Sequence, residues 1–492
     1  MAAGTGGLDG VTGAARRQAP ESDGRNAAEY GGAAEGSGDR GLGARPIGPA
    51  TAGRKPRTPP QPATLEALGL ETNMLIGLLC KVIYRLGLEL AREMAESLHL
   101  PVGLTTQLIE ISKEQKLIEA KGQLGAAVTA EMRYALTAKG REWALEAFHH
   151  NDYVGAVPVP LEQFAAQAAS QSIRGEVLTR PVLERVFDGL TLAPGLMRNL
   201  GPAANSGASM LLYGPPGNGK SSIAEALCRA FGHHVWLPYA IEVDRQVITL
   251  YDPAVHRALT GEELKEAEAD LKGSAASGGG SGIRRAVTAD RRYIACRRPK
   301  LIAGGELTLD MLDLSFSPAS RIYEAPMQLK AAGGVLVIDD FGRQRQHPQE
   351  IINRMIIPLE NGVDFLALQS GRKFEAPFDS LVVFSTNIPP SDLVDEAALR
   401  RLRYKILVDS PDRSLFLRIL AQTAVKAGLP LNEELVLFML EELYAKQGKS
   451  YQAFHPRFII DQAFAICAYE GMEPQLTPDV VGRAWENLFP VH

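Results

Sequence analysis

The feature that most constrains this chain is a glycine-rich loop between a short apolar run and a helix. Met210 to Tyr213 predicts a buried strand, and Ser222 to Phe231 has the residues of a helix. The loop between them reads Gly-Pro-Pro-Gly-Asn-Gly-Lys-Ser, which fits GxxxxGK[ST] in the strand-loop-helix order that the motif requires. Glycines let backbone N–H groups surround phosphates, and the helix N-terminus adds the positive end of its dipole. The loop therefore predicts a site for nucleotide phosphates.

Every residue of this loop, together with Ser222 at the start of the helix, is a candidate for nucleotide binding. The candidates are Gly214, Pro215, Pro216, Gly217, Asn218, Gly219, Lys220, Ser221 and Ser222. Lys220 is expected to reach the β- and γ-phosphates, and the Ser221 hydroxyl to bind Mg²⁺. The expected cofactors are thus ATP and Mg²⁺.

A second apolar run, Gly334 to Ile338, ends in two carboxylates, Asp339 and Asp340. In open α/β sheets ligands bind at the carboxyl ends of strands, so we expect both carboxylates beside the phosphate loop. Asp339 is the candidate ligand of Mg²⁺, directly or through water. Asp340 is the candidate that orients and deprotonates the attacking water.

A third strand, Leu381 to Ser385, leads into Thr386 and Asn387. The Asn387 amide at this strand tip could position the attacking water. Farther along, Arg400, Arg401 and Arg403 follow an Asp-Glu-Ala-Ala-Leu segment, and Arg457 lies near the start of a C-terminal helix. Most arginines at this density are surface residues, and only their order relative to the other motifs marks these.

In that order the segments GPPGNGKS, VLVIDD, VVFSTN and DEAALRRLR, with the later arginine, resemble the AAA+ ATPase family from about Arg174 to the C-terminus. The resemblance implies an α/β fold with a parallel-sheet core and a C-terminal helical lid. It implies that Asn387 is the sensor-1 residue and Arg457 the sensor-2 residue. It further implies that Arg400 and Arg403, which have the family's Arg-x-x-Arg spacing, act as arginine fingers on a neighbouring subunit's ATP. The expected assembly is a homo-oligomeric ring, with a hexamer as the expected size.

Two departures from the family pattern stand out. The usual Asp-Glu pair is Asp-Asp here, so the carboxylate of Asp340 is one methylene short and hydrolysis could be slow. An aromatic-Val-Gly pore loop is not recognisable; Trp236 to Tyr239 and Gly304 to Leu307 fall where such loops would lie, and strand packing accounts for both. Residues 360 to 375 predict a β-hairpin resembling those of several AAA+ clades.

Helical apolar spacing marks a separate N-terminal region. Three helices, two short strands at Leu117 to Lys121 and Met132 to Leu136, and a closing helix from Ala138 to Phe148 resemble a winged helix-turn-helix domain. Between Leu65 and Phe148 there are nine Lys and Arg against eleven Asp and Glu. Since phosphate binding depends on cations, a protein-docking role is favoured over DNA binding.

The rest of the chain divides by composition. Residues 1 to 62 are rich in Gly, Ala, Pro and Arg and predict a disordered tail. The predicted parts are the tail (1–62), the winged-helix-like domain (65–150), a linker (151–173), the ATPase core (174–410, with a flexible insertion at about 262–290) and the helical lid (411–492).

The cysteines and the apolar runs restrict the compartment. The four cysteines are far apart, with no CxxC pair to suggest a disulfide framework or a zinc site. No apolar run approaches the roughly 20 residues of a membrane helix. With a net charge of −5, the chain is not basic overall. We expect a cytoplasmic protein.

Three functions remain open. The first is an ATP hydrolase that remodels a protein partner in the manner of a chaperone. The second is a DNA-binding loader, initiator or regulator that uses the winged helix. The third is a nucleotide switch that hydrolyses weakly, as the short Asp340 side chain suggests. The acidic N-terminal region favours the first over the second, and the otherwise complete motif set favours it over the third.

Overall fold

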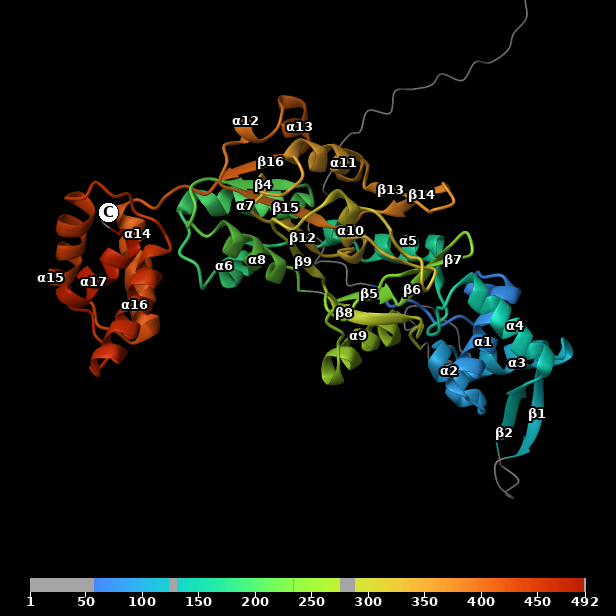
Figure 1. Ribbon diagram of the computed structural model, residues 1–492. Coiled ribbons are helices and arrows are strands. Elements are labelled where there is room, and N and C mark those ends of the chain that lie inside the picture. The colour runs from blue at the N-terminus through green and yellow to red at the C-terminus, as the bar shows by residue number, and fades with distance from the viewer. Residues whose placement is uncertain (1–56, 124–130, 233, 275–287, 491–492) are drawn as a thin grey trace, which may run out of the picture. The chain divides into compact units, whose positions relative to one another are not determined.

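The computed structural model describes residues 57–123, 131–232, 234–274 and 288–490 (Figure 1). Most of the predicted tail and much of the predicted insertion, including most of the Gly/Ser-rich run from Gly273 to Gly282, therefore lie outside the described residues. The end of the predicted tail pairs with the core, since the Gln61 amide donates to the Thr288 carbonyl at 3.0 Å and the Thr58 hydroxyl to the Ala267 carbonyl at 3.1 Å. Among the described residues no helix has the length and apolar character needed to cross a membrane.

The N-terminal region has the predicted order of three helices, two strands and a closing helix. Its elements are η1 (Glu66–Leu68), α1 (Thr72–Leu86), α2 (Ala91–Leu98), α3 (Val102–Glu114), β1 (Ile118–Gln123), β2 (Met132–Leu136) and α4 (Ala138–His150). Gly87 ends α1 in a left-handed conformation, and the Thr137 side chain caps α4 by accepting from the Gly140 amide. The two strands pair antiparallel. Helices and strands share one apolar core that includes Leu79, Leu108 and Leu136.

The main sheet contains five parallel strands in the order β16-β4-β15-β12-β9. They are β4 (Met210–Tyr213), β9 (Lys300–Ala303), β12 (Val335–Ile338), β15 (Leu381–Thr386) and β16 (Tyr404–Leu407). The predicted α/β fold with a parallel-sheet core is confirmed. The strand that ends in Asp339 and Asp340 is an interior strand, while the middle position belongs to β15.

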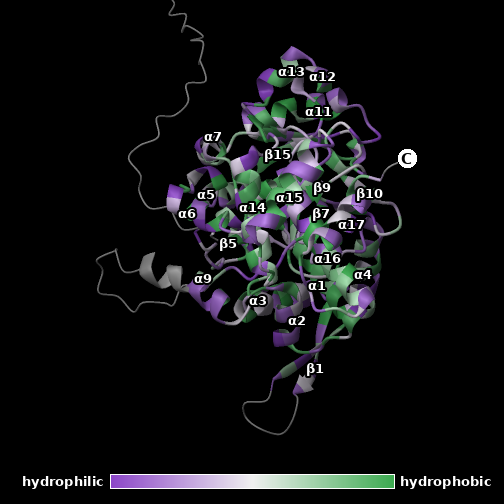
Figure 2. Cartoon of the chain, turned by 90° about the vertical axis from the view of Figure 1, so that its left-hand side faces the viewer, coloured by the Kyte–Doolittle hydropathy of each residue, from purple (hydrophilic) through white to green (hydrophobic). Residues whose placement is uncertain are grey.

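Alternate residues of these strands enter two apolar cores, one on each face of the sheet. On one face Leu212, Val337 and Val383 pack with α6 (Arg180–Val186), α7 (Pro194–Ser206) and α8 (Lys220–Ala230). On the other face Leu211, Leu336 and Phe384 pack with α10 (Met327–Lys330), α11 (Pro348–Asn361), α12 (Pro390–Leu393) and α13 (Glu396–Arg401). Hydrophilic and hydrophobic residues alternate along α12 and α13, as expected for helices that bury one side (Figure 2).

A second sheet, not foreseen in the sequence, has the order β10-β11-β7-β6-β3 and mixes parallel and antiparallel pairs. Its strands are β3 (Val159–Pro160), β6 (Ala240–Val243), β7 (Gln246–Thr249), β10 (Ser315–Ser317) and β11 (Ile322–Glu324). Two antiparallel pairs share its apolar core: β5 (His234–Pro238) with β8 (Tyr293–Arg297), and β13 (Val363–Ala367) with β14 (Lys373–Pro377). The remaining elements of this part are α5 (Leu161–Ser170), η2 (Ile173–Gly175), α9 (Gly261–Ser274) and η4 (Leu309–Leu312).

This part of the fold contains the predicted hairpin and the two segments considered as substrate loops. The predicted hairpin is the β13–β14 pair, but it begins at Val363, because Glu360 and Asn361 are the last residues of α11. Trp236 lies in β5 and is 2% exposed, and Leu307 is fully buried. Both segments considered as substrate loops thus place a large side chain in a core.

The C-terminal region is entirely helical, as predicted. It comprises α14 (Arg413–Ala427), α15 (Glu433–Phe438), the π-helix η5 (Met439–Ala445), α16 (His455–Glu470) and α17 (Pro478–Leu488). A core rich in aromatic side chains, among them Phe416, Tyr444 and Trp485, joins these helices.

Candidate functional site: a nucleotide cavity at the carboxyl edge of the main sheet

The glycine-rich loop joins β4 to α8, and three of its glycines adopt positive φ angles. These are Gly214 at 139°, Gly217 at 78° and Gly219 at 87°. A side chain at Gly214 would also place its Cβ 2.4 Å from the Val408 carbonyl oxygen. Only glycine fits such backbone positions without strain. The loop then passes directly into α8, which begins at Lys220, two residues earlier than predicted.

The Lys220 side chain is folded into the loop. Its Nζ donates to the carbonyl oxygens of Gly214 at 2.9 Å and Pro215 at 2.8 Å. Burial lowers the pKa of Lys220, and the carboxylates of Asp339 and Asp340 partly offset this effect. An ammonium group that is largely removed from water, with two carbonyl contacts, is well placed to exchange these contacts for phosphate oxygens.

Asp339 and Asp340 follow β12, and the turn after them is held by one glutamine. The Gln344 amide donates to the carbonyl oxygens of Asp339 at 3.1 Å and Gly304 at 3.3 Å, and its oxygen accepts from Gly342. Asp339 is half-buried and Asp340 is exposed. Asp340 has a φ of 48°, a conformation that costs a non-glycine residue energy and that often occurs at functional sites.

Asn387 follows β15, the strand beside β12. The Phe341 amide donates to the Ser385 carbonyl at 2.7 Å, and the buried Thr386 hydroxyl donates to the Phe341 carbonyl at 2.5 Å. These two bonds join the ends of the neighbouring strands. They hold the segments that carry Asp340 and Asn387 next to each other.

A cavity of about 610 Å³ lies where these segments meet. Its walls include Pro216 to Ile223, Asp339, Asp340, Ser385, Asn387 and Arg457. Gly214 and Pro215 do not line it and instead present their carbonyls to Lys220. Ser221 and Asp339 contribute a hydroxyl and a carboxylate oxygen, the hard ligands that Mg²⁺ prefers, so the donor set fits this ion.

Residues just before and within the first turn of α16 contribute to one wall of this cavity. The Phe454 amide donates to the Gly217 carbonyl at 3.0 Å, and the Ala453 amide donates to Asn218 Oδ1 at 3.2 Å. A Cβ on Gly217 would lie 2.3 Å from the Phe454 ring, so this glycine also permits close approach. Arg457 is 81% exposed and forms an ion pair with Asp461 at 3.5 Å. Because an exposed ion pair of this kind contributes little to stability, the Arg457 guanidinium can exchange Asp461 for a phosphate.

Part of the cavity lining was not predicted from the sequence. It consists of Gly189 to Leu192 from the segment before α7, and of Ile419, Gln422, Thr423 and Lys426 from α14. Lys426 Nζ donates to the Gly189 carbonyl at 3.3 Å, and Thr191 bonds to Gln422. These residues carry no motif, and only the fold brings them together.

The three arginines at the end of α13 differ in their surroundings. Arg401 Nε pairs with Glu360 at 3.0 Å, and its guanidinium also donates to the Ala397 carbonyl. Arg400 and Arg403 are exposed and, within the described part of the chain, make no side-chain hydrogen bond or ion pair. Neither lines the cavity. Arg401 is thus engaged inside the protein, and the other two are directed to the surface.

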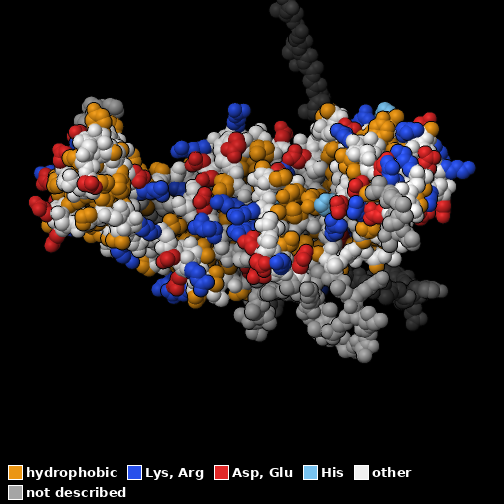
Figure 3. Space-filling model, turned by 90° about the horizontal axis from the view of Figure 1, so that it is seen from below, with side chains coloured by type: hydrophobic (Ala, Val, Ile, Leu, Met, Phe, Trp, Pro, Cys, Tyr) orange, Lys and Arg blue, Asp and Glu red, His pale blue; other side chains and the backbone are white. Residues whose placement is uncertain are grey.

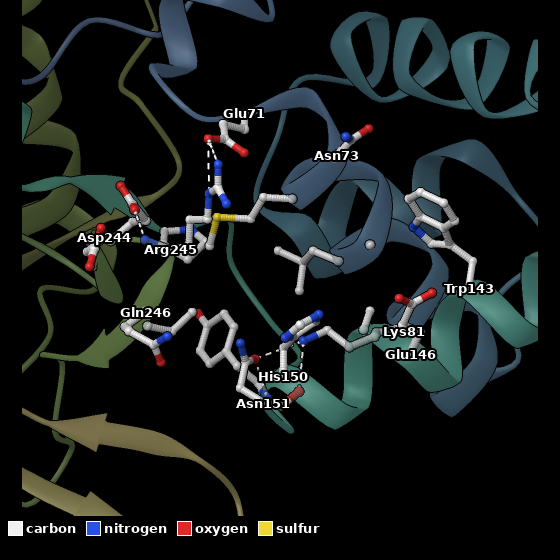
Figure 4. Close-up of a pocket in the computed structure, with 18 residues that line it drawn as sticks. Glu71, Asn73, Lys81, Trp143, Glu146, His150, Asn151, Asp244, Arg245 and Gln246 are labelled. Carbon is white, nitrogen blue, oxygen red and sulfur yellow. Dashed lines mark hydrogen bonds and ion pairs between the residues drawn. The ribbon is translucent and has the colours of Figure 1, made fainter. Parts of the chain in front are cut away.

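A second cavity, of about 980 Å³, lies between α1, α4 and the turn that joins β6 to β7 (Figure 4). Lys81 is 4% exposed there and donates to the carbonyl and Oδ1 of Asn151 at 3.1 and 2.9 Å. Burial lowers the pKa of Lys81 to about 8. Figure 4 shows Arg245 directed at Glu71, with which it pairs at 2.7 Å. None of the sequence-predicted site residues lines this cavity.

Two family models match the sequence. Residues 210–265 match the ATPase family associated with various cellular activities (AAA), and residues 412–487 match a domain of unknown function, DUF8689. The first match begins at β4 and includes the whole phosphate loop. The segment that carries the phosphate loop is thus similar to the AAA family of ATPases. The second match covers most of the C-terminal helical region, from α14 to α17.

Other comparisons add little to the family assignment. No curated protein matches the sequence. Among solved structures, NtrX from Brucella abortus is similar over 72% of this chain and 63% of the NtrX chain, at 12% identity and a TM-score of 0.35. The chain thus spans less than two thirds of NtrX, and a likeness at this level says nothing of function.

Proposed function

We propose that this AAA+ protein binds ATP with Mg²⁺ in the 610 Å³ cavity and couples its hydrolysis to the remodelling of a protein partner. The observation that carries the proposal is the convergence of Lys220, Asp339, Asp340, Asn387 and Arg457 on one cavity. These residues come from four separate parts of the sequence, and more than a hundred residues lie between Lys220 and Asp339. Their meeting is the arrangement that phosphoryl transfer needs, in which positioning and charge stabilisation supply most of the catalysis.

Each side chain has a role that follows from its chemistry. Lys220 and the loop amides bind the β- and γ-phosphates, and Ser221 and Asp339 hold Mg²⁺. Mg²⁺, when bound, neutralises charge on the phosphates. Asp340 orients the attacking water and accepts its proton, while Asn387 holds that water in place.

The arginines stabilise charge that develops on the γ-phosphate. Arg457 does so from the lid, in the same chain. Arg400 and Arg403 are exposed and do not line the cavity, which suits fingers supplied to a neighbouring copy of the chain. The proposed assembly is accordingly a homo-oligomeric ring.

The partner proposal depends on the N-terminal region. Its helices and β1–β2 pair have the element order of a winged helix, but its acidic side chains outnumber the basic ones by two between Leu65 and Phe148. On α3, Lys113 is already paired with Glu110 at 2.8 Å. A surface of this charge attracts phosphate weakly. We therefore assign protein docking to this region.

The nucleotide site is tested by Lys220→Ala. The substitution removes the cation that offsets phosphate charge, and we expect ATP affinity to fall on the order of 100-fold or more. Titration of the purified chain with a fluorescent ATP analogue measures it. Lys373→Ala, at an exposed lysine of β14, is the matched control. Unchanged affinity in a folded Lys220→Ala protein would refute the assignment of the site.

A further inference from the structure

A basic hollow lies at the opposite edge of the main sheet from the nucleotide cavity. Its volume is about 770 Å³, and its cationic walls are formed by Arg229, Arg257, Arg297, Arg298 and Lys300. Lys300 pairs in register with Val335, the first residue of β12, whereas Asp339 follows the last residue of that strand. Arg229 likewise lies at the end of α8, whose first residue is Lys220. The hollow is thus a separate site.

Three of its cations, Arg297, Arg298 and Lys300, come from a segment that is unusually basic for this chain. Residues 284 to 300 contain six arginines in three Arg-Arg pairs, and Lys300, against the single acid Asp290. The whole chain, by contrast, has a net charge of −5. A basic segment in an acidic protein is a typical footprint of polyanion binding.

In both Arg-Arg pairs that the structure describes, one arginine is buried and its neighbour is exposed. Arg292 is 2% exposed and pairs with Asp290 at 2.8 Å. The Arg298 side chain is 4% exposed, pairs with Glu176 at 3.0 Å and donates to the Gln171 carbonyl. The buried members fix the backbone, and the exposed Arg291 and Arg297 are held at the surface by it.

Two acidic residues, Glu263 and Glu266, also line the hollow, so they compensate part of the charge of its five cations. Arg297 pairs with Glu263, and Lys300 pairs with Glu225 at 3.6 Å, both among exposed groups. Such surface pairs contribute little and exchange readily for a better anion. Arg229 and Arg257 make no ion pair among the described residues. Lys and Arg side chains gather on the face of the described residues that Figure 3 shows, with acidic side chains beside them.

We propose that the basic hollow binds the sugar–phosphate backbone of nucleic acid, without reading its base sequence. The planar guanidinium group matches phosphate geometry with two parallel hydrogen bonds, and four of the five cations are arginines. Its lining phenylalanine, Phe231, is 5% exposed, so it offers no surface on which a base could stack. This binding goes beyond the proposed remodelling activity and uses a different edge of the sheet.

The test is binding of the full chain to fluorescently labelled mixed-sequence DNA, single-stranded and duplex, by anisotropy over a series of salt concentrations. The variant Arg229→Gln/Arg257→Gln/Lys300→Gln removes three charges of the hollow. The control, Arg141→Gln/Arg198→Gln/Lys373→Gln, removes three exposed charges elsewhere. The ATP affinity of each variant reports whether its fold is intact.

We expect micromolar binding at low salt that weakens as salt rises. Each phosphate contact contributes about −0.9 to the slope of log affinity against log salt for duplex DNA, so the hollow variant should have a slope shallower by about 2 to 3. Its affinity at low salt should fall at least about tenfold, a loss that follows from the same counterion release. The control variant should bind like the wild type.

Three results would overturn the inference. One is no binding to either DNA at low salt, and another is a loss in the control variant as large as in the hollow variant. The third is tighter binding of polyglutamate of matched length, which would assign the hollow to an acidic protein segment. Lys220→Ala separates this inference from the proposed ATP site, because it should lose ATP binding and keep DNA binding.

Discussion

Asp340 combines the chemistry of a base with a backbone conformation that side chains rarely adopt. Its φ of 48° lies in the left-handed region, which Asp and Asn tolerate better than other non-glycine residues. Asp340→Asn should therefore keep the turn and the ATP affinity. It removes the proton acceptor, and we expect the turnover rate to fall on the order of 100-fold or more.

Steady-state phosphate release, with nucleotide binding measured in parallel, checks this prediction. A wild-type chain that already turns over negligibly would favour the nucleotide-switch alternative. Equal and substantial rates in the two proteins would remove Asp340 from the catalytic role.

At the residue scale, short motifs were enough to find one end of the cavity. The phosphate loop, the two aspartates, Asn387 and Arg457 were all named from the sequence, and the structure brings them to one cavity while their roles remain predictions. Phe454, Gln422 and Lys426 could not be found in this way. They are ordinary helix and loop residues, and they reach the cavity only because the lid folds back onto Gly189 and Gly217.

At the element scale, His455 begins the helix that carries Arg457, and its protonation should affect the lid. Its ring bonds to the Tyr444 hydroxyl at 2.8 Å, and burial lowers the pKa of His455 to about 4. The unfolded chain, with a pKa near 6.5, takes up this proton first, so stability is complete above about pH 6.5 and decreases toward pH 4. The shift corresponds to on the order of 3 kcal/mol at pH 4.

His455→Gln keeps a hydrogen-bonding group beside Tyr444 but does not titrate. Urea unfolding at pH 7 and pH 4.5 should show a smaller acid loss in this variant than in the wild type, while His149→Gln, at an exposed histidine of α4, should behave like the wild type. Identical acid losses in all three proteins would contradict the assignment.

A buried ion pair connects α11 to the β13–β14 hairpin. Asp364, at 3% exposure, accepts from Arg354 at 2.7 Å and from the Gln328 amide at 2.7 Å, and Arg354 also contacts Asp313 at 2.8 Å. Arg354→Leu leaves the Asp364 carboxylate buried with only the amide as partner. We expect a loss of about 3 kcal/mol in the free energy of unfolding.

Adding Asp364→Leu to Arg354→Leu should recover part of that loss, because no buried charge then remains. Urea unfolding of the two variants measures the difference. If the double variant has a lower free energy of unfolding than Arg354→Leu, the loss does not come from the unpaired Asp364 carboxylate.

The sequence predicted correctly whether a segment is a helix or a strand where its apolar pattern was long or where a motif lay next to it. Three strands of the main sheet, β4, β12 and β15, and the helices of both ends were predicted on those grounds, whereas β9 and β16 were not. The second sheet was not, because its strands have two to four residues and β3 pairs with β6 about 80 positions later. The β13–β14 hairpin was placed two to three residues early, since the apolar spacing of α11 continues up to its end at Asn361.

At the scale of the whole molecule, the two proposed binding sites lie at opposite ends of the strands of the main sheet. The nucleotide cavity lies at the carboxyl ends of the strands, and the basic hollow lies where β9 and β12 begin. The α8 helix of eleven residues, about 16 Å long, runs from the phosphate loop to the hollow. A polyanion held at the hollow would thus contact the same helix that binds phosphate at its other end.

In the proposed ring, the exposed Arg400 and Arg403 of one chain complete the ATP site of its neighbour. Arg400→Ala and Arg403→Ala should each reduce ATP hydrolysis on the order of 100-fold while leaving ATP affinity nearly unchanged, because a finger supplied by a neighbour stabilises charge in the transition state. Arg401→Ala should instead lower stability through the loss of its pair with Glu360 at 3.0 Å.

Mixing experiments separate a shared site from a self-contained one. A Lys220→Ala chain lacks its own ATP site but still carries both fingers, and an Arg400→Ala chain has the site without one finger. If the site is completed by a neighbour, mixing the two inactive proteins pairs an intact site with an intact finger, and a fraction of the activity should return. A mixture of Lys220→Ala with Asp340→Asn should stay inactive, because neither chain then has a competent site. Full activity of an Arg400→Ala/Arg403→Ala chain, or of wild-type monomers at high dilution, would show that each chain hydrolyses ATP alone.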